Sequence, residues 1–135
     1  MSRAGVARGT ILLAEDEPNV MYTLKTVLED AGFQVQAVPS FAQARRSMQE
    51  TSFDAVITEI GLENGDLGLE LASEAKKLSR PPAVVIYTGN PTVDRLRRAL
   101  KLRVDYIAFK PGDLQEIMAA LFRLITRRAM AATTS

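Results

Sequence analysis

Five short apolar runs, each followed by a segment with helical periodicity, constrain the fold of this chain more than any other feature. Most of these runs are apolar throughout and rich in β-branched residues, which is typical of strands buried on both faces. They lie at residues 10–14 (TILLA), 33–38 (FQVQAV), 55–58 (AVIT), 83–88 (AVVIYT) and 106–109 (YIAF). The run 33–38 instead alternates, with Gln34 and Gln36 on one side, and this alternation predicts an edge strand.

The segments between the runs repeat apolar residues every three or four positions, which predicts one helix after each strand. For the fourth of these helices, Asn90 followed by Pro91 predicts the N-terminus, because asparagine is a good N-cap and proline fits the first helical position. We expect Val93, Leu96 and Leu100 of that helix to face the core.

Five strand–helix pairs predict an α/β fold in three layers, a doubly wound parallel sheet with right-handed crossovers. The chain has 135 residues, of which 47% are hydrophobic, enough for one domain with a core of its own. We expect residues 10–128 to form this domain, with flexible tails at 1–9 and 129–135. No apolar run has the length of a signal peptide or a membrane span, which favours a soluble, cytoplasmic protein that does not bind membranes.

The composition excludes several kinds of chemistry. The chain contains neither Cys nor His, so it lacks thiolates, the commonest general base and the commonest transition-metal ligand. No pair of nucleophile and base is visible, and we expect a protein that is not an enzyme. The net charge is +1, and the densest cationic segment is a single predicted helix with no helix-turn-helix beside it. We therefore expect no direct contact with nucleic acid.

Charged and hydroxyl side chains stand where four of the predicted strands end. Glu15 and Asp16 follow the first strand, Glu59 the third and Lys110 the fifth, while Thr88 closes the fourth. In doubly wound sheets the functional crevice lies at this edge. Clustered carboxylates favour a divalent cation, and without His or Cys the cation that fits is a hard one such as Mg²⁺. A nearby ammonium and hydroxyl can stabilise the oxygens of a phosphoryl group.

Four motifs in order, ILLAEDEP, FDAVITEIGL, VVIYTG and FKP, resemble the receiver domain of two-component response regulators over residues 10 to 127. The resemblance implies a flavodoxin-like strand order, 2-1-3-4-5. In that family a histidine kinase phosphorylates an aspartate after the third strand. Carried over, the acceptor position is Glu59, the contacts to the phosphoryl group are Thr88 and Lys110, and the Lys110–Pro111 bond is cis. The implied Mg²⁺ ligands are Glu15, Asp16, Glu59 and the carbonyl of Gly61.

Glu59 departs from the family pattern, because the acceptor position normally holds aspartate. The additional methylene moves the carboxylate, and a misplacement of about 1 Å can slow a reaction by about 10²-fold. We therefore do not expect an acyl phosphate on Glu59. Either Glu59 imitates a phosphorylated aspartate by reaching Thr88 or Lys110, or the domain is an unswitched docking module. A Glu59–Lys110 ion pair that fills the pocket is a further alternative, and so is a mutant of an ordinary aspartate receiver.

Two further departures concern the switch and the loop after Glu59. The family has an aromatic residue three positions before the lysine, where this chain has Ile107, with Tyr106 one position earlier. A shift by one residue places a side chain on the other face of the sheet. The loop GLENGDLG has Glu63 where proline is usual, so we expect another acidic group near the pocket. The glycines of this loop, Gly65 and Gly68, suggest a mobile segment.

The cationic fourth helix is either a solvated face, with Asp94 and Arg98 as an i,i+4 pair, or a surface for a protein partner. Under the second interpretation the partner face includes Arg95, Arg98, Lys101 and Tyr106. The resemblance implies a histidine kinase or a downstream signalling protein as the partner, or a homodimer through the fourth helix, the fifth strand and the last helix. We expect an atypical receiver that acts as a protein-interaction module. The alternative is a receiver competent for phosphotransfer with Mg²⁺.

A small enzyme or a flavin carrier on the same fold is a third class of function. The loop after the first strand argues against a flavin phosphate site, because it is Glu-Asp-Glu rather than a hydroxyl- and glycine-rich loop that can bind an anion.

Overall fold

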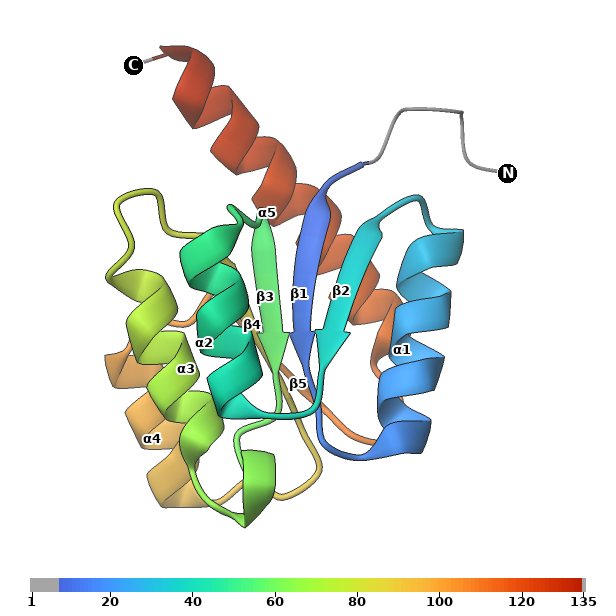
Figure 1. Cartoon of the computed structure of the whole chain (residues 1–135), viewed down its shortest axis with the longest axis vertical. Coiled ribbons are helices and arrows are strands. Elements are labelled where there is room, and N and C mark those ends of the chain that lie inside the picture. Colours follow the sequence, from blue (N-terminus) through green and yellow to red (C-terminus); the bar gives the residue numbers. More distant parts are fainter. Residues whose placement is uncertain (1–7, 135) are drawn as a thin grey trace.

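The computed structural model describes residues 8–134 and shows five parallel strands with helices on both faces (Figure 1). The strands are β1 (Thr10–Ala14), β2 (Gln34–Val38), β3 (Ala55–Thr58), β4 (Ala83–Thr88) and β5 (Tyr106–Phe109). The helices are α1 (Pro18–Asp30), α2 (Phe41–Glu50), α3 (Leu67–Lys76), α4 (Val93–Lys101) and α5 (Leu114–Thr134), with a 3₁₀ turn at Leu62–Asn64.

The strand order is β2-β1-β3-β4-β5, which confirms the predicted doubly wound, flavodoxin-like fold. The alternating strand β2 lies at an edge, as its glutamines predicted. The last residues of β1 and β3, Ala14 and Thr58, are level with each other and with Ile86 of β4, which continues to Thr88, so β1 and β3 end side by side. The chain order reverses on either side of β1, which places the functional crevice of such a sheet beyond the ends of β1 and β3.

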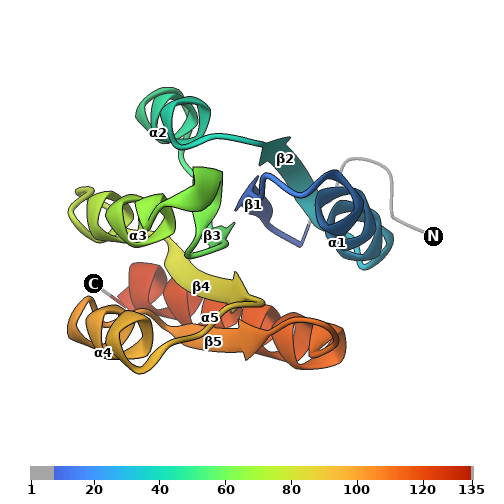
Figure 2. The same ribbon diagram turned by 90° about the horizontal axis from the view of Figure 1, so that it is seen from below.

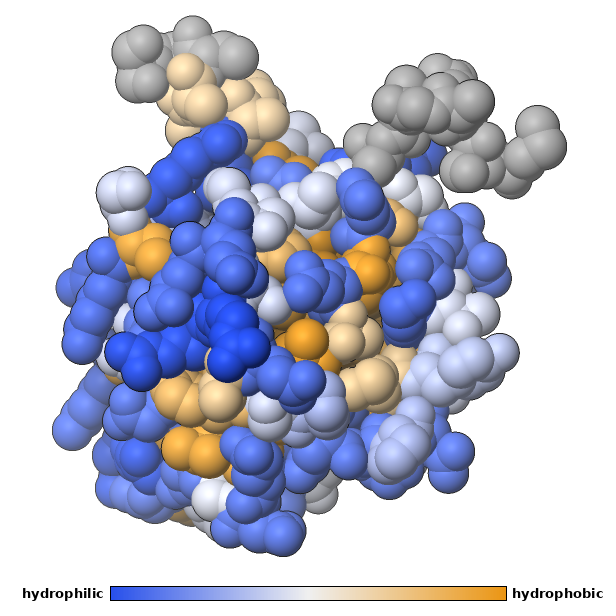
Figure 3. All heavy atoms as spheres, in the orientation of Figure 1, coloured by the Kyte–Doolittle hydropathy of each residue, from blue (hydrophilic) through white to orange (hydrophobic). Residues whose placement is uncertain are grey.

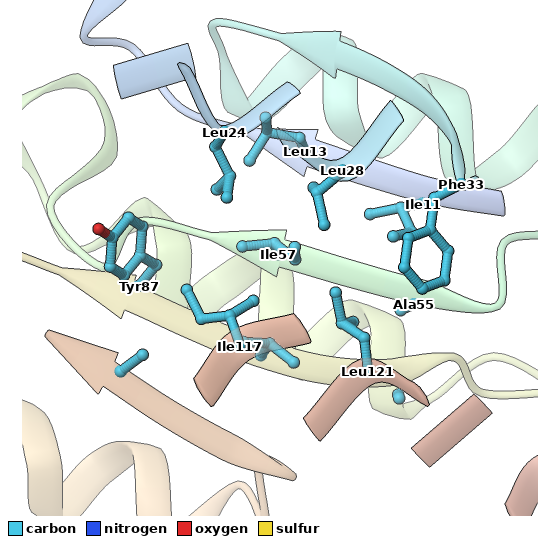
Figure 4. Close-up of a cluster of buried hydrophobic side chains, with 13 residues drawn as sticks. Ile11, Leu13, Leu24, Leu28, Phe33, Ala55, Ile57, Tyr87, Ile117 and Leu121 are labelled. Carbon is cyan, nitrogen blue, oxygen red and sulfur yellow. The ribbon is translucent and has the colours of Figure 1, made fainter. Parts of the chain in front are cut away.

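Helices α1 and α5 cover one face of the sheet, and α2, α3 and α4 cover the other (Figure 2). On the first face Leu24 and Leu28 of α1 and Ile117 and Leu121 of α5 surround Ile57 of β3 (Figure 4). All five side chains are buried. The central strands are thus enclosed from both sides, which explains why their sequences are apolar without alternation.

Helix α5 continues to Thr134, where the sequence predicted a flexible tail from residue 129. Alanine and methionine, which favour helices, follow Arg128, and no glycine or proline interrupts them. The last turns extend past the edge of the sheet at which the strands begin (Figure 1). Of the two predicted tails, residues 1–7 and 135 lie outside the described residues. Arg8 is attached to the domain, since its N–H donates to the carbonyl of Gly32 at 2.9 Å.

Helix α4 differs from the prediction in its start and in its buried face. Its N-cap is Thr92, whose hydroxyl accepts a hydrogen bond from the Arg95 N–H at 3.1 Å, and not Asn90. Val93 and Leu100 were expected in the core but are 71% and 67% exposed, and Ala99 is buried in their place. The prediction was wrong because the small Ala99 side chain, and not the larger apolar residues, faces the sheet.

The surface over α2 and α3 is mostly hydrophilic, with apolar side chains in small separate patches (Figure 3). Within the described residues, no helix combines the length and the hydropathy that crossing a bilayer requires.

Candidate functional site

The C-terminal ends of β1, β3, β4 and β5 meet at a cavity of about 430 Å³. The structure thus brings together the carboxylates after β1 and β3 and the lysine after β5, as the sequence predicted. The residues that line the cavity are Glu15, Asp16, Glu17, Val20, Glu59, Gly61, Asn64, Gly89, Asn90, Arg95 and Lys110. Lys110 precedes a cis bond to Pro111, also as predicted.

The ammonium of Lys110 lies between two carboxylates at one side of this cavity. Its Nζ is 2.6 Å from Oε1 of Glu15 and 2.9 Å from Oε1 of Glu59. The three side chains are largely buried, with 15%, 3% and 12% of the Lys110, Glu15 and Glu59 side chains exposed. Lys110 therefore balances one of the two negative charges directly, with short and partly desolvated contacts. The ion pair that the sequence suggested as an alternative is present, and Glu15 shares in it.

Glu59 directs both carboxylate oxygens at groups of the domain itself. Oε1 also accepts from the Gly89 N–H at 3.4 Å, and Oε2 accepts from the Gly61 N–H at 3.2 Å. The buried Thr88 side chain contributes to lowering the pKa of the same carboxylate, and its hydroxyl accepts a hydrogen bond from the Asn90 N–H at 3.3 Å. Among the described residues, no buried side-chain oxygen or nitrogen lacks a hydrogen-bond partner. The two carboxylate oxygens thus accept from Lys110 and from two backbone N–H groups.

Burial and the ion pairs shift the three pKa values in different directions. Burial raises the pKa of Glu15, although the Lys110 ammonium and the Glu17 N–H oppose the shift. Burial would also raise the pKa of Glu59, but hydrogen bonds from Thr88 and Lys110 outweigh it and lower that pKa. For Lys110, burial is outweighed by Glu15 and Glu59, which raise the pKa of the ammonium. The charged form of Glu59 is therefore favoured in the folded state, whereas that of Glu15 is not.

Asp16 and Glu63 tie the loop after Glu59 to other parts of the domain. Oδ2 of Asp16 accepts from the Glu63 N–H at 2.8 Å, and Oε2 of Glu63 accepts from the Phe41 N–H at the start of α2, at 3.1 Å. The Glu63 carboxylate thus bonds to the N-terminus of α2, where a negative charge is favoured, and it is not among the residues that line the cavity. Glu63 thus lies next to the cavity, as expected, but its carboxylate is directed at α2 and not into the cavity.

Gly68 belongs to α3 and is buried there, so the prediction of a mobile glycine segment was wrong for this residue. A Cβ at this position would overlap the backbone carbonyl of Glu59, and the Gly68 N–H donates to the carbonyl of Ile60 at 3.0 Å. Only glycine permits this close approach of α3 to the backbone after β3. Gly65 has no such neighbour, since a Cβ there would reach only Leu67, at 3.9 Å.

The expected Mg²⁺ ligands have suitable oxygen donors, but their arrangement does not fit the ion. Glu15 and Glu59 are directed at Lys110, and Asp16 accepts the Glu63 N–H. The carbonyl of Gly61 accepts from the Asn64 N–H at 3.0 Å. Within residues 8–134, no group of three or more acidic side chains is placed to hold a metal. A Mg²⁺ ion bound to Oε1 of Glu15 or of Glu59 would compete with the ammonium of Lys110 for that oxygen.

Ile107 and Tyr106 lie on opposite faces of the sheet, as the alternation of a strand requires. Ile107 packs beside Ile86 and Ala99 on the α4 side, and Tyr106 packs against the cluster that contains Leu121 on the α5 side. Tyr106 is therefore on the face of the sheet away from α4.

Two residues of the expected partner face are engaged within the domain. Nε of Arg95 is 3.0 Å from Oδ1 of Asp66 and its Nη1 is 2.9 Å from the carbonyl of Asn90, so that Arg95 lines the cavity. Nη1 of Arg98 is 2.6 Å from Oδ2 of Asp66, and 3.7 Å from the predicted partner Asp94. The hydrogen bond from Arg98, with those from Arg95, lowers the pKa of Asp66. Lys101 is exposed, whereas Tyr106 is half-buried.

The role of Asp66 could not be found from the sequence. The only signal was a pair of arginines three positions apart, which share one side of a helix. Nothing in that spacing identifies an acid in the loop after β3 as their partner.

Comparison with known proteins agrees with this architecture. The family model for the response regulator receiver domain matches residues 11–122. The chain is 28% identical over 131 residues to the transcriptional regulatory protein PrrA of Mycobacterium leprae, covering 97% of the chain and 56% of the relative. It is 30% identical over 133 residues to the alginate biosynthesis transcriptional regulatory protein AlgB of Pseudomonas syringae, covering 98% of the chain and 29% of the relative. The chain thus spans about half the length of these relatives or less.

A solved receiver domain from Clostridium thermocellum superimposes with a TM-score of 0.82 at 28% identity, covering 93% of the chain and 99% of that domain. The fold, the matched segment and the cluster of acidic residues with Lys110 agree with one another. The chain therefore belongs to the family of response regulator receiver domains.

Proposed function

We propose that this domain is a receiver with a fixed pocket, which acts in two-component signal transduction as a protein-interaction module and not as an enzyme. Glu59 takes the place of the phosphoacceptor aspartate. The observation that carries the proposal is the position of Lys110, whose ammonium bridges Glu15 and Glu59. The Lys110 ammonium, which would bind the oxygens of a phosphoryl group, is already bonded to these two carboxylates.

Two features of Glu59 support the absence of phosphotransfer. Oε1 of its carboxylate accepts from Lys110 and from the Gly89 N–H, and Oε2 accepts from the Gly61 N–H, so these contacts hold the carboxylate in place and lower its reactivity as a nucleophile. Its additional methylene also displaces the carboxylate from the position that an aspartate occupies, and group transfer tolerates such displacements poorly.

The same contacts also favour the hypothesis that Glu59 imitates a phosphorylated aspartate. Thr88 and Lys110 are the two side chains that the family uses to contact the phosphoryl group; Glu59 is bonded to Lys110, and Thr88 contributes to lowering its pKa. The imitation is incomplete, because a carboxylate carries one negative charge and a phosphoryl group carries about two. Under either hypothesis the domain has one constant state.

Receiver domains interact with kinases and effector proteins, and we propose a partner of this kind, a histidine kinase or a downstream signalling protein. A homodimer through α4, β5 and α5 is the alternative partner. Receiver domains generally bind Mg²⁺. We expect weak binding here, since Lys110 competes for Glu15 and Glu59. We propose no direct contact with nucleic acid.

The test is incubation with Mg²⁺ and acetyl phosphate, followed by mass spectrometry of the intact protein. We expect no adduct on the unaltered domain and a mass gain of one phosphoryl group on Glu59→Asp, which restores the family's acceptor. A stoichiometric, hydroxylamine-labile adduct on Glu59 itself would refute the proposal. The Asp variant is the matched control, because it shows that the rest of the pocket and the phosphodonor are competent.

The imitation hypothesis requires a separate comparison. Binding to a partner, or dimerisation, is measured for the unaltered domain, Glu59→Asp and Glu59→Gln. If Glu59→Gln binds the partner or dimerises as the unaltered domain does, the negative charge of Glu59 does not imitate a phosphorylated aspartate.

A further inference from the structure

Helix α4 contributes fewer buried side chains than the other α-helices that the structure describes. Only Ala99 of its nine residues is buried, whereas five of the ten residues of α3 are buried. Arg95 and Leu96 are half-buried, and the rest of the helix is exposed. One buried methyl group and one half-buried leucine remove little apolar area from water, so hydrophobic burial contributes little to holding α4 in place.

The carboxylate of Asp66, at the start of α3, provides a second attachment for α4. Its Oδ1 is 2.9 Å from Nη2 of Arg95 and 3.0 Å from Nε of the same side chain. Its Oδ2 is 2.6 Å from Nη1 of Arg98. Both oxygens are thus bonded to arginines that lie one turn apart on α4. We refer to Asp66, Arg95 and Arg98 as the α4 clamp.

The position of Asp66 in its own helix does not explain the direction of its carboxylate. Asp66 occupies the N-cap position of α3, where an aspartate usually accepts a hydrogen bond from an N–H of the helix that it precedes. Its side chain makes no such capping bond and is directed at α4 instead. The side chains of Arg95 and Asp66 are only 18% and 34% exposed, so this ion pair is partly desolvated and stronger than one on the open surface.

The buried side chains next to α4 form a small cluster, in which Ala99 packs with Ile60, Leu69 and Ile86. The two larger clusters of the described residues, one on each face of the sheet, contain no residue of α4. Detachment of α4 would therefore uncover part of the small cluster and leave the two larger ones intact. A local opening of this kind requires much less free energy than unfolding of the whole domain.

We propose that the α4 clamp, rather than apolar packing, holds α4 on the sheet, and that α4 detaches when the clamp breaks while the rest of the domain stays folded. The charges of the clamp lie close to solvent, so dissolved salt weakens them. Arg95 lines the acidic cavity and donates to the carbonyl of Asn90 at 2.9 Å, so detachment also removes part of the cavity wall. Glu59 and Lys110 take no part in the clamp, and the inference does not rest on the proposed function.

The test is amide hydrogen exchange of the whole chain, followed by NMR at low and at high salt. We expect the amides of α4 to exchange faster than those of Ile117 and Leu121, which lie in the core of α5, and added salt to accelerate exchange on α4 alone. Asp66→Asn should accelerate exchange on α4 by about tenfold or more, because a neutral amide replaces the charged acceptor of both arginines.

The matched control is Asp94→Asn, which removes the same charge from a carboxylate 3.7 Å from Arg98. Asp94 belongs to α4 itself and does not connect the helix to the sheet, so exchange on α4 should change by less than about threefold. Asp66→Asn also removes a negative charge from the N-terminus of α3, which a mutant cycle separates from the clamp. In a chain that carries Arg95→Gln and Arg98→Gln, Asp66→Asn should add less than about twofold.

Three results would overturn the proposal. The first is exchange on α4 that is as slow as in the core of α5, both in the unaltered chain and in Asp66→Asn. The second is an equal acceleration of all helices in Asp66→Asn, which would show that α4 opens only when the whole domain unfolds. The third is an effect of Asp66→Asn that is undiminished when both arginines are replaced, which would show that Asp66 acts through α3.

Discussion

Lys110 and Glu59, 51 positions apart in the sequence, form an ion pair of 2.9 Å that joins the end of β5 to the end of β3. Glu15 binds the same ammonium from the end of β1. Three strands are thus connected at one edge of the sheet through a single cation. Two carboxylates and one ammonium leave this cluster with one net negative charge, and the following two predictions depend on that imbalance.

Replacing Lys110 with methionine should destabilise the domain by about 2–3 kcal/mol, because two buried carboxylates lose charged hydrogen bonds from one donor. It should also turn the cluster into a cation site, so that Mg²⁺ recovers part of the lost stability. Urea unfolding with and without Mg²⁺ measures both effects. The unaltered domain, measured in the same two buffers, should respond little. An equal response of the two proteins would show that Lys110 does not compete with the ion.

Glu59→Gln and Glu15→Gln should differ in stability at neutral pH. The pKa of Glu59 is below its ordinary value of 4.5, so its charge stabilises the fold above that pH, and this contribution is lost as the pH falls through the folded pKa. The pKa of Glu15 is raised, so its charge is unfavourable in the folded state. Glu59→Gln should therefore destabilise more than Glu15→Gln at pH 7.

The difference between these two variants should shrink below pH 4.5, where glutamate becomes as neutral as glutamine. The measurement is the free energy of unfolding of both variants between neutral pH and pH values below 4.5. A difference that stays constant, or that grows on acidification, contradicts the assignment of the two pKa shifts.

Gly68→Ala should destabilise the domain by about 1–3 kcal/mol, since its methyl group meets the backbone of Glu59 and forces α3 away. The matched control is Gly65→Ala in the preceding loop, where a Cβ finds space. Thermal unfolding of the two variants provides the comparison. If they lose the same stability, the close packing of α3 against β3 is not the reason for Gly68.

Arg128→Ala should loosen the last turns of α5. The Arg128 side chain binds Oδ1 of Asp54 at 3.2 Å and the carbonyl of Pro81 at 3.1 Å, which holds this part of the helix against the sheet. We expect a local loss of about 1 kcal/mol, seen as faster hydrogen exchange of amides near residue 128. Arg127→Ala, one position earlier and exposed, should leave the exchange unchanged.

The strands followed from the sequence because β1, β3 and β4 are buried on both faces, which leaves a continuous apolar signal, whereas their order was implied by the resemblance to receiver domains. The sequence did not predict correctly which face of α4 is buried. Its rotation depends on the bond between Arg95 and Asp66, 29 positions apart, and helical periodicity contains no information about such a partner. The small residue Ala99 also gave a weaker signal than Val93 and Leu100.

For the candidate site, the sequence predicted the charged residues at its centre and offered the Glu59–Lys110 ion pair as an alternative, but not the remaining bonds of these groups. Strand ends place Glu15, Glu59 and Lys110 at one edge in any fold of this class. Which oxygen each group meets depends on side-chain torsions and on backbone groups such as the N–H of Gly61. For the same reason the direction of Glu63 toward α2 was missed, since the left-handed φ of 57° that turns the backbone at this residue has no signature in a glutamate.

The bridge formed by Lys110 has a consequence for how such a domain conveys information. Under the proposed function, the pocket is never phosphorylated, so neither a kinase nor a phosphatase can change its state. The fraction of partner that is bound then depends only on how much of the domain the cell contains relative to the dissociation constant. The concentration of the domain, which synthesis and degradation set, then determines how much partner is bound. That amount can change only as fast as the protein is made and degraded.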